Sequence, residues 1–204
     1  MQVIKVLPVF SGSNSYIVTE DGKDAVVIDP SGENVSERLE VLSLNCKYVL
    51  LTHGHFDHVG GCKTLADTGA KIYCGEEEKD LIFSPEYLNM FGGVYVPKFE
   101  VDKTVKGGEK LNFCGLPVEV MAASGHTKGG VCYIINDCIF TGDTLFQGSV
   151  GRCDLPYGDF NKLSKSLAKL NALKGDYKLY CGHGDDSTLD IERKYNPYLR
   201  NLKC

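Results

Sequence analysis

The sequence predicts an α/β fold, and three observations lead to that expectation. Short strand-like runs alternate with helix-like segments along most of the 204 residues. Residues 48–52 are apolar on both faces, as expected of a strand inside a covered sheet. Polar side chains with nitrogen or oxygen donors follow directly after several predicted strands. Because open sheets bind ligands in the crevice outside their strand ends, this last pattern also predicts where a functional site lies.

The amino-terminal part is predicted to begin as a meander. The β-branched runs at residues 3–10, 16–19 and 25–28 are short, and Gly, Asn and Asp turns separate them. Residues 33–44 then place their apolar side chains at helical spacing. The strand at 48–52 follows this helix, and a histidine-rich hexapeptide begins at the next residue.

The rest of the chain continues the alternation. Further helices are predicted at residues 61–68, 76–83, 160–173 and 189–195. Ser187 is a candidate N-cap of the last of these helices, with Asp190 three residues on. Gly107 and Gly108 resemble a tight hairpin turn. Since no linker, repeat or low-complexity segment interrupts the pattern, we expect one domain over residues 1–204.

The composition narrows the classes of function. A hydrophobic content of 43% and a charged content of 24% are ordinary for a soluble globular protein. The net charge of −5 and the scattered Lys and Arg argue against a nucleic-acid partner. No apolar stretch approaches the length of a membrane span, and we see no signal peptide. Nine cysteines without C-x-x-C spacing argue against disulfides and a zinc knuckle, so a reducing cytoplasm is expected.

All five histidines are predicted to lie in turns at strand ends. Three of them, His53, His55 and His58, fall in one hexapeptide after the strand at 48–52. His126 follows a predicted strand at 118–123, and His183 follows another at 178–181; Asp143 comes after a strand at 138–141. Histidine is the commonest metal ligand, so these loops predict a metal site at one sheet edge. The alternative is a solvated polar turn with two unrelated core histidines.

The donor segments resemble those of the metallo-β-lactamase superfamily. They are Thr52 to His58, Gly125-His126-Thr127, Thr141-Gly142-Asp143 and Gly182-His183-Gly184. Within that superfamily the chain looks most like the short, single-domain glyoxalase II-like (hydroxyacylglutathione hydrolase) branch, on residues 145–156 and 182–197. The resemblance implies a four-layer αββα sandwich, in which helices flank two mixed β-sheets and the metals lie at one rim of the sheets.

The resemblance also implies roles for individual residues. His53, His55 and His126 would hold a first metal, Asp57, His58 and His183 a second, and Asp143 would bridge the two. Asp57 and Asp143 are the catalytic candidates. Imidazole and carboxylate donors without thiolate suit Zn²⁺, Fe²⁺ or Mn²⁺, and a His-rich set favours zinc. True β-lactamases of the superfamily commonly have a Cys ligand near Asp143, so the chain departs from them.

The implied activity is hydrolysis of a small thioester such as S-lactoylglutathione or a related hydroxyacyl-thiol. Two divalent ions that share a water lower its pKa towards about 7, so a bridging hydroxide can attack the carbonyl. The chain departs from the pattern of longer glyoxalase II proteins at two points, and both concern which thiol carries the acyl group. The chain ends about twenty residues after His183, where longer glyoxalase II proteins carry a glutathione-gripping helical region, and Gly130 stands at a usual His position. The alternatives are a persulfide dioxygenase with one iron, a lactone hydrolase, and a non-catalytic binding module.

Three further features have two interpretations each. Arg152 stands where the family places a substrate-contacting cation, but it also suits an ion pair with Asp154 or Asp159. Residues 83–97 are aromatic and Gly-rich, and they form either an apolar wall over the site or a surface insertion that packs on its own sandwich or on a homodimer partner. Residues 76–78, three glutamates, are expected to be the solvated first turn of a helix.

Overall fold

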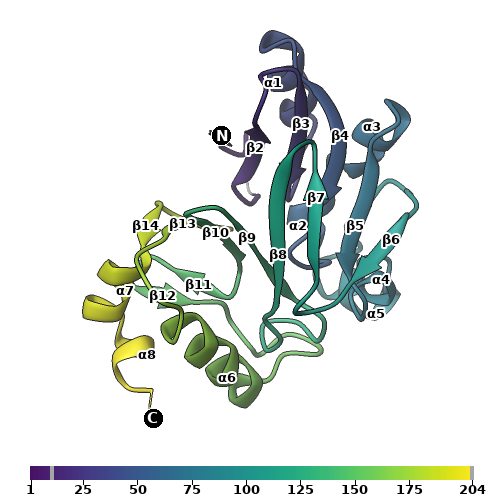
Figure 1. Ribbon diagram of the computed structural model, residues 1–204. Coiled ribbons are helices and arrows are strands. Elements are labelled where there is room, and N and C mark those ends of the chain that lie inside the picture. Colours follow the sequence, from purple (N-terminus) through teal and green to yellow (C-terminus); the bar gives the residue numbers. More distant parts are fainter. Residues whose placement is uncertain (10–11, 203–204) are drawn as a thin grey trace.

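The computed structural model describes residues 1–9 and 12–202, and in them two six-stranded sheets pack face to face (Figure 1). Helices cover the outer face of each sheet, so the layers run helix, sheet, sheet, helix. This is the α/β class and the four-layer αββα arrangement that we expected. No described helix is long and apolar enough to cross a membrane.

The first sheet contains the amino-terminal strands in chain order. They are β1 (Gln2–Val6), β2 (Ser15–Thr19), β3 (Asp24–Ile28), β4 (Asn45–Leu50), β5 (Lys71–Gly75) and β6 (Lys103–Val105). The first three strands are antiparallel, as a meander requires, and β3 to β6 are parallel. Parallel neighbours need crossovers. The one from β3 to β4 contains α1 (Asn34–Val41), and the one from β4 to β5 contains α2 (Phe56–Val59) and α3 (Cys62–Asp67).

The second sheet is also mixed. Its order is β14 (Ser187–Thr188), β13 (Lys178–Cys181), β10 (Cys138–Gly142), β9 (Val131–Ile135), β8 (Leu116–Ala122) and β7 (Lys110–Phe113). Only β10 and β13 pair in parallel, across the crossover that contains α6 (Phe160–Asn171). A small hairpin of β11 (Leu145–Phe146) and β12 (Ser149–Val150) follows β10.

Shorter helices complete the chain. They are α4 (Lys79–Ile82), α5 (Pro85–Met90), α7 (Leu189–Tyr195) and α8 (Pro197–Arg200). The helix predicted at 76–83 is thus reduced to one turn. Thr188, and not Ser187, is the N-cap of α7: its hydroxyl accepts a hydrogen bond from the amide of Ile191, whereas the Ser187 hydroxyl donates to Glu192.

Alternation along the strands builds three apolar layers. On β2 and β3, Ile17 and Val27 face the outer helices, whereas Val18 and Val26 face the second sheet. Strand β10 shows the same alternation, since Phe140 packs between the sheets and Ile139 packs against the layer that contains α6. A strand with both faces covered must be apolar on both faces, which explains the continuous apolar runs in the sequence.

The predicted hairpin at Gly107 and Gly108 is wrong. The two glycines connect β6 of the first sheet to β7 of the second, so the chain crosses between layers there. A Cβ on Gly107 would lie 2.6 Å from the Cβ of Ala122, and Gly108 has a φ of +93°. The crossing therefore needs glycine for close approach and for a left-handed backbone. The strand predicted at 3–10 ends at Val6, and Phe10 lies outside the described residues.

Candidate metal centre

The predicted donors gather at one rim because of the strand directions. In the second sheet β8, β10 and β13 all run the same way, since β9 is antiparallel to both β8 and β10 and β13 is parallel to β10. Their carboxyl ends release His126, Asp143 and His183. In the first sheet β4 ends just before His53. The two rims are joined directly, because the amide of Val131 donates a hydrogen bond to the carbonyl of Thr52.

The first donor group consists of His53, His55 and His126. One ligand atom from each lies within 4.8 Å of the others, and all three side chains are buried. The closest pair is Nε2 of His126 and Nδ1 of His55, which are 2.9 Å apart. The ring centroids are 4.5 to 4.8 Å apart, with interplanar angles of 80 to 82°. The three imidazoles thus meet edge to face, with a ring nitrogen of each close to those of the other two.

The second donor group consists of Asp57, His58 and His183. Oδ2 of Asp57 lies 3.3 Å from Nε2 of His183 and 3.9 Å from Nε2 of His58. His58 is fully buried, whereas the His183 side chain is 40% exposed. The group therefore opens to solvent on the His183 side, where a substrate would enter.

Asp143 lies between the two groups. Its Oδ1 is 3.3 Å from Nε2 of His58, and its Oδ2 is 3.4 Å from Nε2 of both His126 and His183. One carboxylate thus reaches a member of the first group and two members of the second. The structure places all seven predicted donors within one cluster, and the bridging role of Asp143 stays a prediction.

Unpaired polar atoms allow a test of whether these residues fit metal ions. Among the described residues, Nε2 of His53, His55 and His58 and Oδ1 of Asp143 are buried without a hydrogen-bond partner. A buried polar atom without a partner is costly and needs an explanation. Divalent ions held by imidazole nitrogen and carboxylate oxygen supply that explanation for His53, His58 and Asp143, whereas His55 faces His126 through its other ring nitrogen, Nδ1. Cys is absent from the donor groups. The residues present therefore fit such ions.

Neighbouring groups fix the tautomers of three imidazoles. His58 donates through Nδ1 to Oδ2 of Asp29 at 2.9 Å, and His126 donates through Nδ1 to the carbonyl of Arg152 at 2.7 Å. The Nδ1 atom of His53 lies 3.0 Å from the hydroxyl of Thr52. A proton held at Nδ1 leaves the Nε2 lone pair free for a metal, as in metal sites generally.

Asp29 is a residue of the site that the sequence analysis did not predict. It directly follows the predicted strand at 25–28, which is the same placement as that of the other donors. It lies close enough to His53 and His58 to form a donor group with them. However, its Oδ1 accepts from the amide of Thr52 at 2.7 Å, and its Oδ2 accepts from the Thr52 hydroxyl at 2.6 Å as well as from His58. Both oxygens are occupied, so Asp29 orients ligands.

Burial and neighbouring charges shift the histidine pKa values of the two donor groups in different directions. Burial, and then the neighbouring imidazoles, hold the pKa of His53 well below its usual value and lower the pKa of His55 to about 3. The first group is therefore neutral at pH 7, the form that binds metal. Hydrogen bonds to Asp143 and Asp57 raise the pKa of His183 to about 9. Burial opposes ionisation of Asp143, but the charge of His58 and the hydrogen bonds from His183 and His58 together outweigh it and hold the Asp143 pKa well below its usual range.

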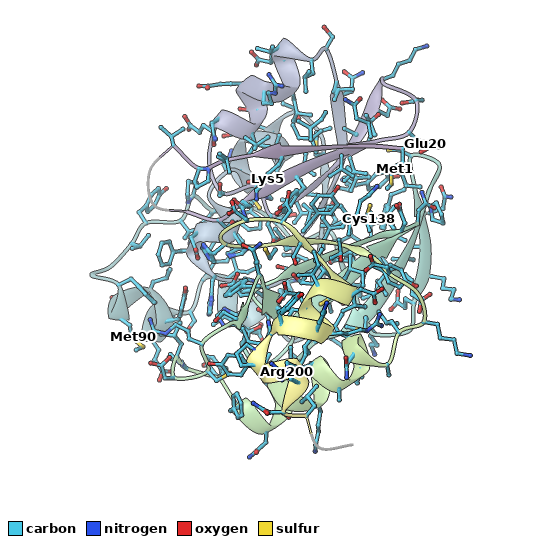
Figure 2. All side chains as sticks on the ribbon, turned by 90° about the vertical axis from the view of Figure 1, so that its left-hand side faces the viewer. Met1, Lys5, Glu20, Met90, Cys138 and Arg200 are labelled. Atoms are coloured by element: carbon cyan, nitrogen blue, oxygen red, sulfur yellow. The ribbon has the colours of Figure 1, made fainter. Side chains whose placement is uncertain are left out.

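The first sheet holds the His183 loop in place. Nδ2 of Asn14 donates to the carbonyls of Cys181 and Gly184 at 2.9 and 3.0 Å. The Tyr16 hydroxyl donates to the Cys181 carbonyl at 2.7 Å, and Lys5, labelled in Figure 2, donates to Gly184 at 3.0 Å. Residues at opposite ends of the chain therefore fix this loop.

A cavity of about 360 Å³ opens over both donor groups. Its walls include Phe56, Tyr87, Phe91 and Phe146, and the Tyr87 ring stacks on His55 at 4.6 Å with an interplanar angle of 9°. Part of the segment 83–97 thus forms an apolar wall, the first of its two interpretations. The same segment also carries exposed residues: Met90 lies at the outer edge of the molecule (Figure 2).

Arg152 matches both of its interpretations. It lines the cavity, and its Nε and Nη2 atoms each lie 2.7 Å from a carboxylate oxygen of Asp154. The ion pair is exposed, with side-chain exposures of 59% and 68%, so it contributes little to stability. At the cavity the guanidinium thus pairs with Asp154, which competes with a substrate for it, and Asp159 instead caps α6.

The expectation that residues 76–78 are solvated is wrong for Glu78. Glu76 and Glu77 are exposed, but Glu78 is completely buried. Its carboxylate accepts hydrogen bonds from the backbone amides of Gly54 and Gly129, on the loops that carry the first donor group. Its sequence neighbours carry no signal of this burial.

Comparison with known proteins gives the family. A model of the metallo-beta-lactamase superfamily matches residues 8–183. The chain is 37% identical to hydroxyacylglutathione hydrolase GloC of Haemophilus influenzae, over 97% of this chain and 98% of that protein. The chain is also similar to two crystal structures, each 30% identical in sequence. BLEG-1 B3 metallo-beta-lactamase has a TM-score of 0.89 over 97% of this chain and 98% of the other. A di-iron-bound form of TTHA1623 has a TM-score of 0.83 over 98% of this chain and 100% of the other. With its clustered His and Asp groups able to hold metal ions, the chain belongs to the metallo-beta-lactamase superfamily.

Proposed function

We propose that the protein is a dinuclear metal-dependent hydrolase that cleaves a small thioester, such as S-lactoylglutathione or a related hydroxyacyl-thiol. The observation that carries the proposal is the pair of donor groups joined by Asp143, with unpaired buried imidazole nitrogens in both. The similarity to a hydroxyacylglutathione hydrolase supports the thioester. Zinc is our first candidate ion because the donors are mostly imidazoles, and iron and manganese suit the same donors.

The residues of the chain have distinct tasks in this proposal. His53, His55 and His126 would hold one ion, and Asp57, His58 and His183 the other, with Asp143 shared. Bound ions would acidify a water and polarise the substrate carbonyl. Asp57 is half-buried and lines the cavity, which supports assigning its carboxylate to orient the attacking water and to accept its proton.

The cavity suits an acyl group on a thiol. Its aromatic side chains exclude water from the reacting carbonyl, while His183 and Asp57 face the opening. A thiolate leaves readily because thiols ionise near pH 8.5. The leaving group therefore needs no dedicated acid, and the proton taken up by Asp57 can return to solvent. We place this reaction in the cytoplasm, in keeping with the many unpaired cysteines.

A substrate panel tests the proposal on protein purified without added metal. The panel contains S-lactoylglutathione, a hydroxyacyl ester of a smaller thiol, a lactone, a β-lactam, and glutathione persulfide with an oxygen electrode. We expect a thioester to have the highest kcat/KM and oxygen uptake to be absent. The proposal would be contradicted if the lactone or the β-lactam were hydrolysed with a higher kcat/KM than every thioester. Oxygen uptake with one iron per chain would contradict it as well and would indicate a persulfide dioxygenase.

Arg152 provides a test of substrate contact. Arg152→Ala is expected to raise KM about tenfold, since a lost charge-assisted hydrogen bond costs about 1.5 kcal/mol, with metal content unchanged. Asp154→Ala is the matched variant: it breaks the same ion pair but frees the guanidinium, so KM should stay the same or fall. If Arg152→Ala and wild type have the same KM, Arg152 does not contact the substrate and its ion pair with Asp154 has a structural role only.

A further inference from the structure

Glu78 is a buried carboxylate that joins two separate loops. It lies in the turn before α4 and has no exposed surface. Its Oε2 accepts the amide proton of Gly54, and its Oε1 accepts that of Gly129, both at 2.7 Å. The two partners are 24 and 51 residues away in sequence. Hydrogen bonds to an ionised acceptor are roughly twice as strong as neutral ones.

The glycines allow this arrangement because both backbones approach closely. A Cβ on Gly54 would lie 2.9 Å from a side-chain carbon of Ile82, and one on Gly129 would lie 2.8 Å from the Cβ of Glu77. With any other residue at either position, the segment containing Glu78 would have to move away. The contact is therefore built into the packing of the loops.

The two loops are those that carry the first donor group. Gly54 separates His53 from His55, and Gly129 comes three residues after His126. The Nδ1 atom of His55 and Nε2 of His126 face each other across 2.9 Å, so the relative position of the loops determines whether both can bind one ion. The hydrogen bonds of His53 and His126 at Nδ1 orient the rings, and the backbone hydrogen bond from Val131 to Thr52 joins the loops at Thr52, before His53.

We propose that Glu78 is a positioning residue that holds the His53–His55 loop and the His126 loop at the separation one metal ion requires. The inference rests on the proposed metal site but not on the identity of the substrate. It predicts an effect on metal affinity and turnover that exceeds any effect on folding. A role in fold stability alone predicts the reverse.

Glu78→Gln is the informative variant because glutamine keeps the shape but has one acceptor oxygen. Its NH₂ group would face an amide N–H, so one of the two hydrogen bonds is lost. We expect zinc affinity, measured by competition with a chromophoric chelator well below the Tm, to fall 10–100-fold. The kcat should fall by a similar factor with KM changed less than twofold. Glu77→Gln, in which only the exposed pair with Lys128 is lost, should match wild type.

Amide hydrogen exchange of metal-free protein separates this proposal from the proposed function. The amides of Gly54 and Gly129 should exchange slowly in wild type and at least about tenfold faster in Glu78→Gln. If slow exchange is observed but wild type binds no zinc, the proposed function fails and the contact stands. Fast exchange of both amides in wild type would overturn the inference, even where the variant does not fold. A lower Tm of Glu78→Gln with unchanged zinc affinity and kcat would also overturn it.

Discussion

Replacing Asp143 with alanine is expected to lower kcat by at least about 10²–10³-fold, the cost of removing one preorganised electrostatic group. The same variant should retain at most one ion per chain, because the Asp143 carboxylate lies within 3.4 Å of ligand atoms in both donor groups. Mass spectrometry of metals and steady-state kinetics on the best thioester measure the two effects. Asp143→Asn should behave similarly, since it keeps the volume but loses the charge.

The control for Asp143 is another aspartate near the same strand. Asp137 precedes β10 and makes an exposed ion pair with Lys178, so Asp137→Ala should leave metal content and kcat unchanged. Full activity and two ions in Asp143→Ala would refute the bridging assignment.

Removing the ions with a chelator is expected to abolish activity and to destabilise the fold. An ion that binds the native state at a free concentration 100 times its Kd contributes about 2.7 kcal/mol. For a chain of this length that shift corresponds to a Tm lower by roughly 5–10 °C per ion. The structural reason is the set of buried, unpaired imidazole nitrogens and the Asp143 oxygen that a bound ion satisfies. Thermal melts with and without chelator measure the effect.

Reversibility distinguishes metal loss from damage. Zinc added in excess should restore both Tm and kcat, and Asp143→Ala should show a smaller Tm change on chelation because it has less metal to lose. A wild-type Tm that is unaffected by chelation, together with undiminished activity, would mean that the clustered side chains do not depend on ions.

The strand-end placement of the donors allowed the site to be predicted from sequence. Strands that run in the same direction deliver their following residues to the same rim, so His126, Asp143 and His183 meet although they lie far apart in the chain. Apolar runs such as 48–52 also indicated covered sheets. The apolar runs and the polar residues after strands are local patterns that the sequence displays directly, whereas the shared direction of β8, β10 and β13 comes from the sheet topology.

The supporting residues could not be predicted in the same way. Glu78 lies in a run of three glutamates, and a run of like charges is normally solvated. Its burial is explained by its contacts with Gly54 and Gly129, which lie 24 and 51 residues away. The Gly107-Gly108 pair suits a hairpin as well as a crossing between sheets, and the close packing of Gly107 on Ala122 is seen only in the folded chain. Such choices depend on tertiary packing between distant segments.

The number of ions bound by the wild-type protein tests the central claim most directly. Metal-free protein titrated with zinc, then passed through a desalting column and analysed by mass spectrometry, should contain two ions per chain. One ion per chain, or none, would contradict a pair of sites built from these seven imidazole and carboxylate side chains.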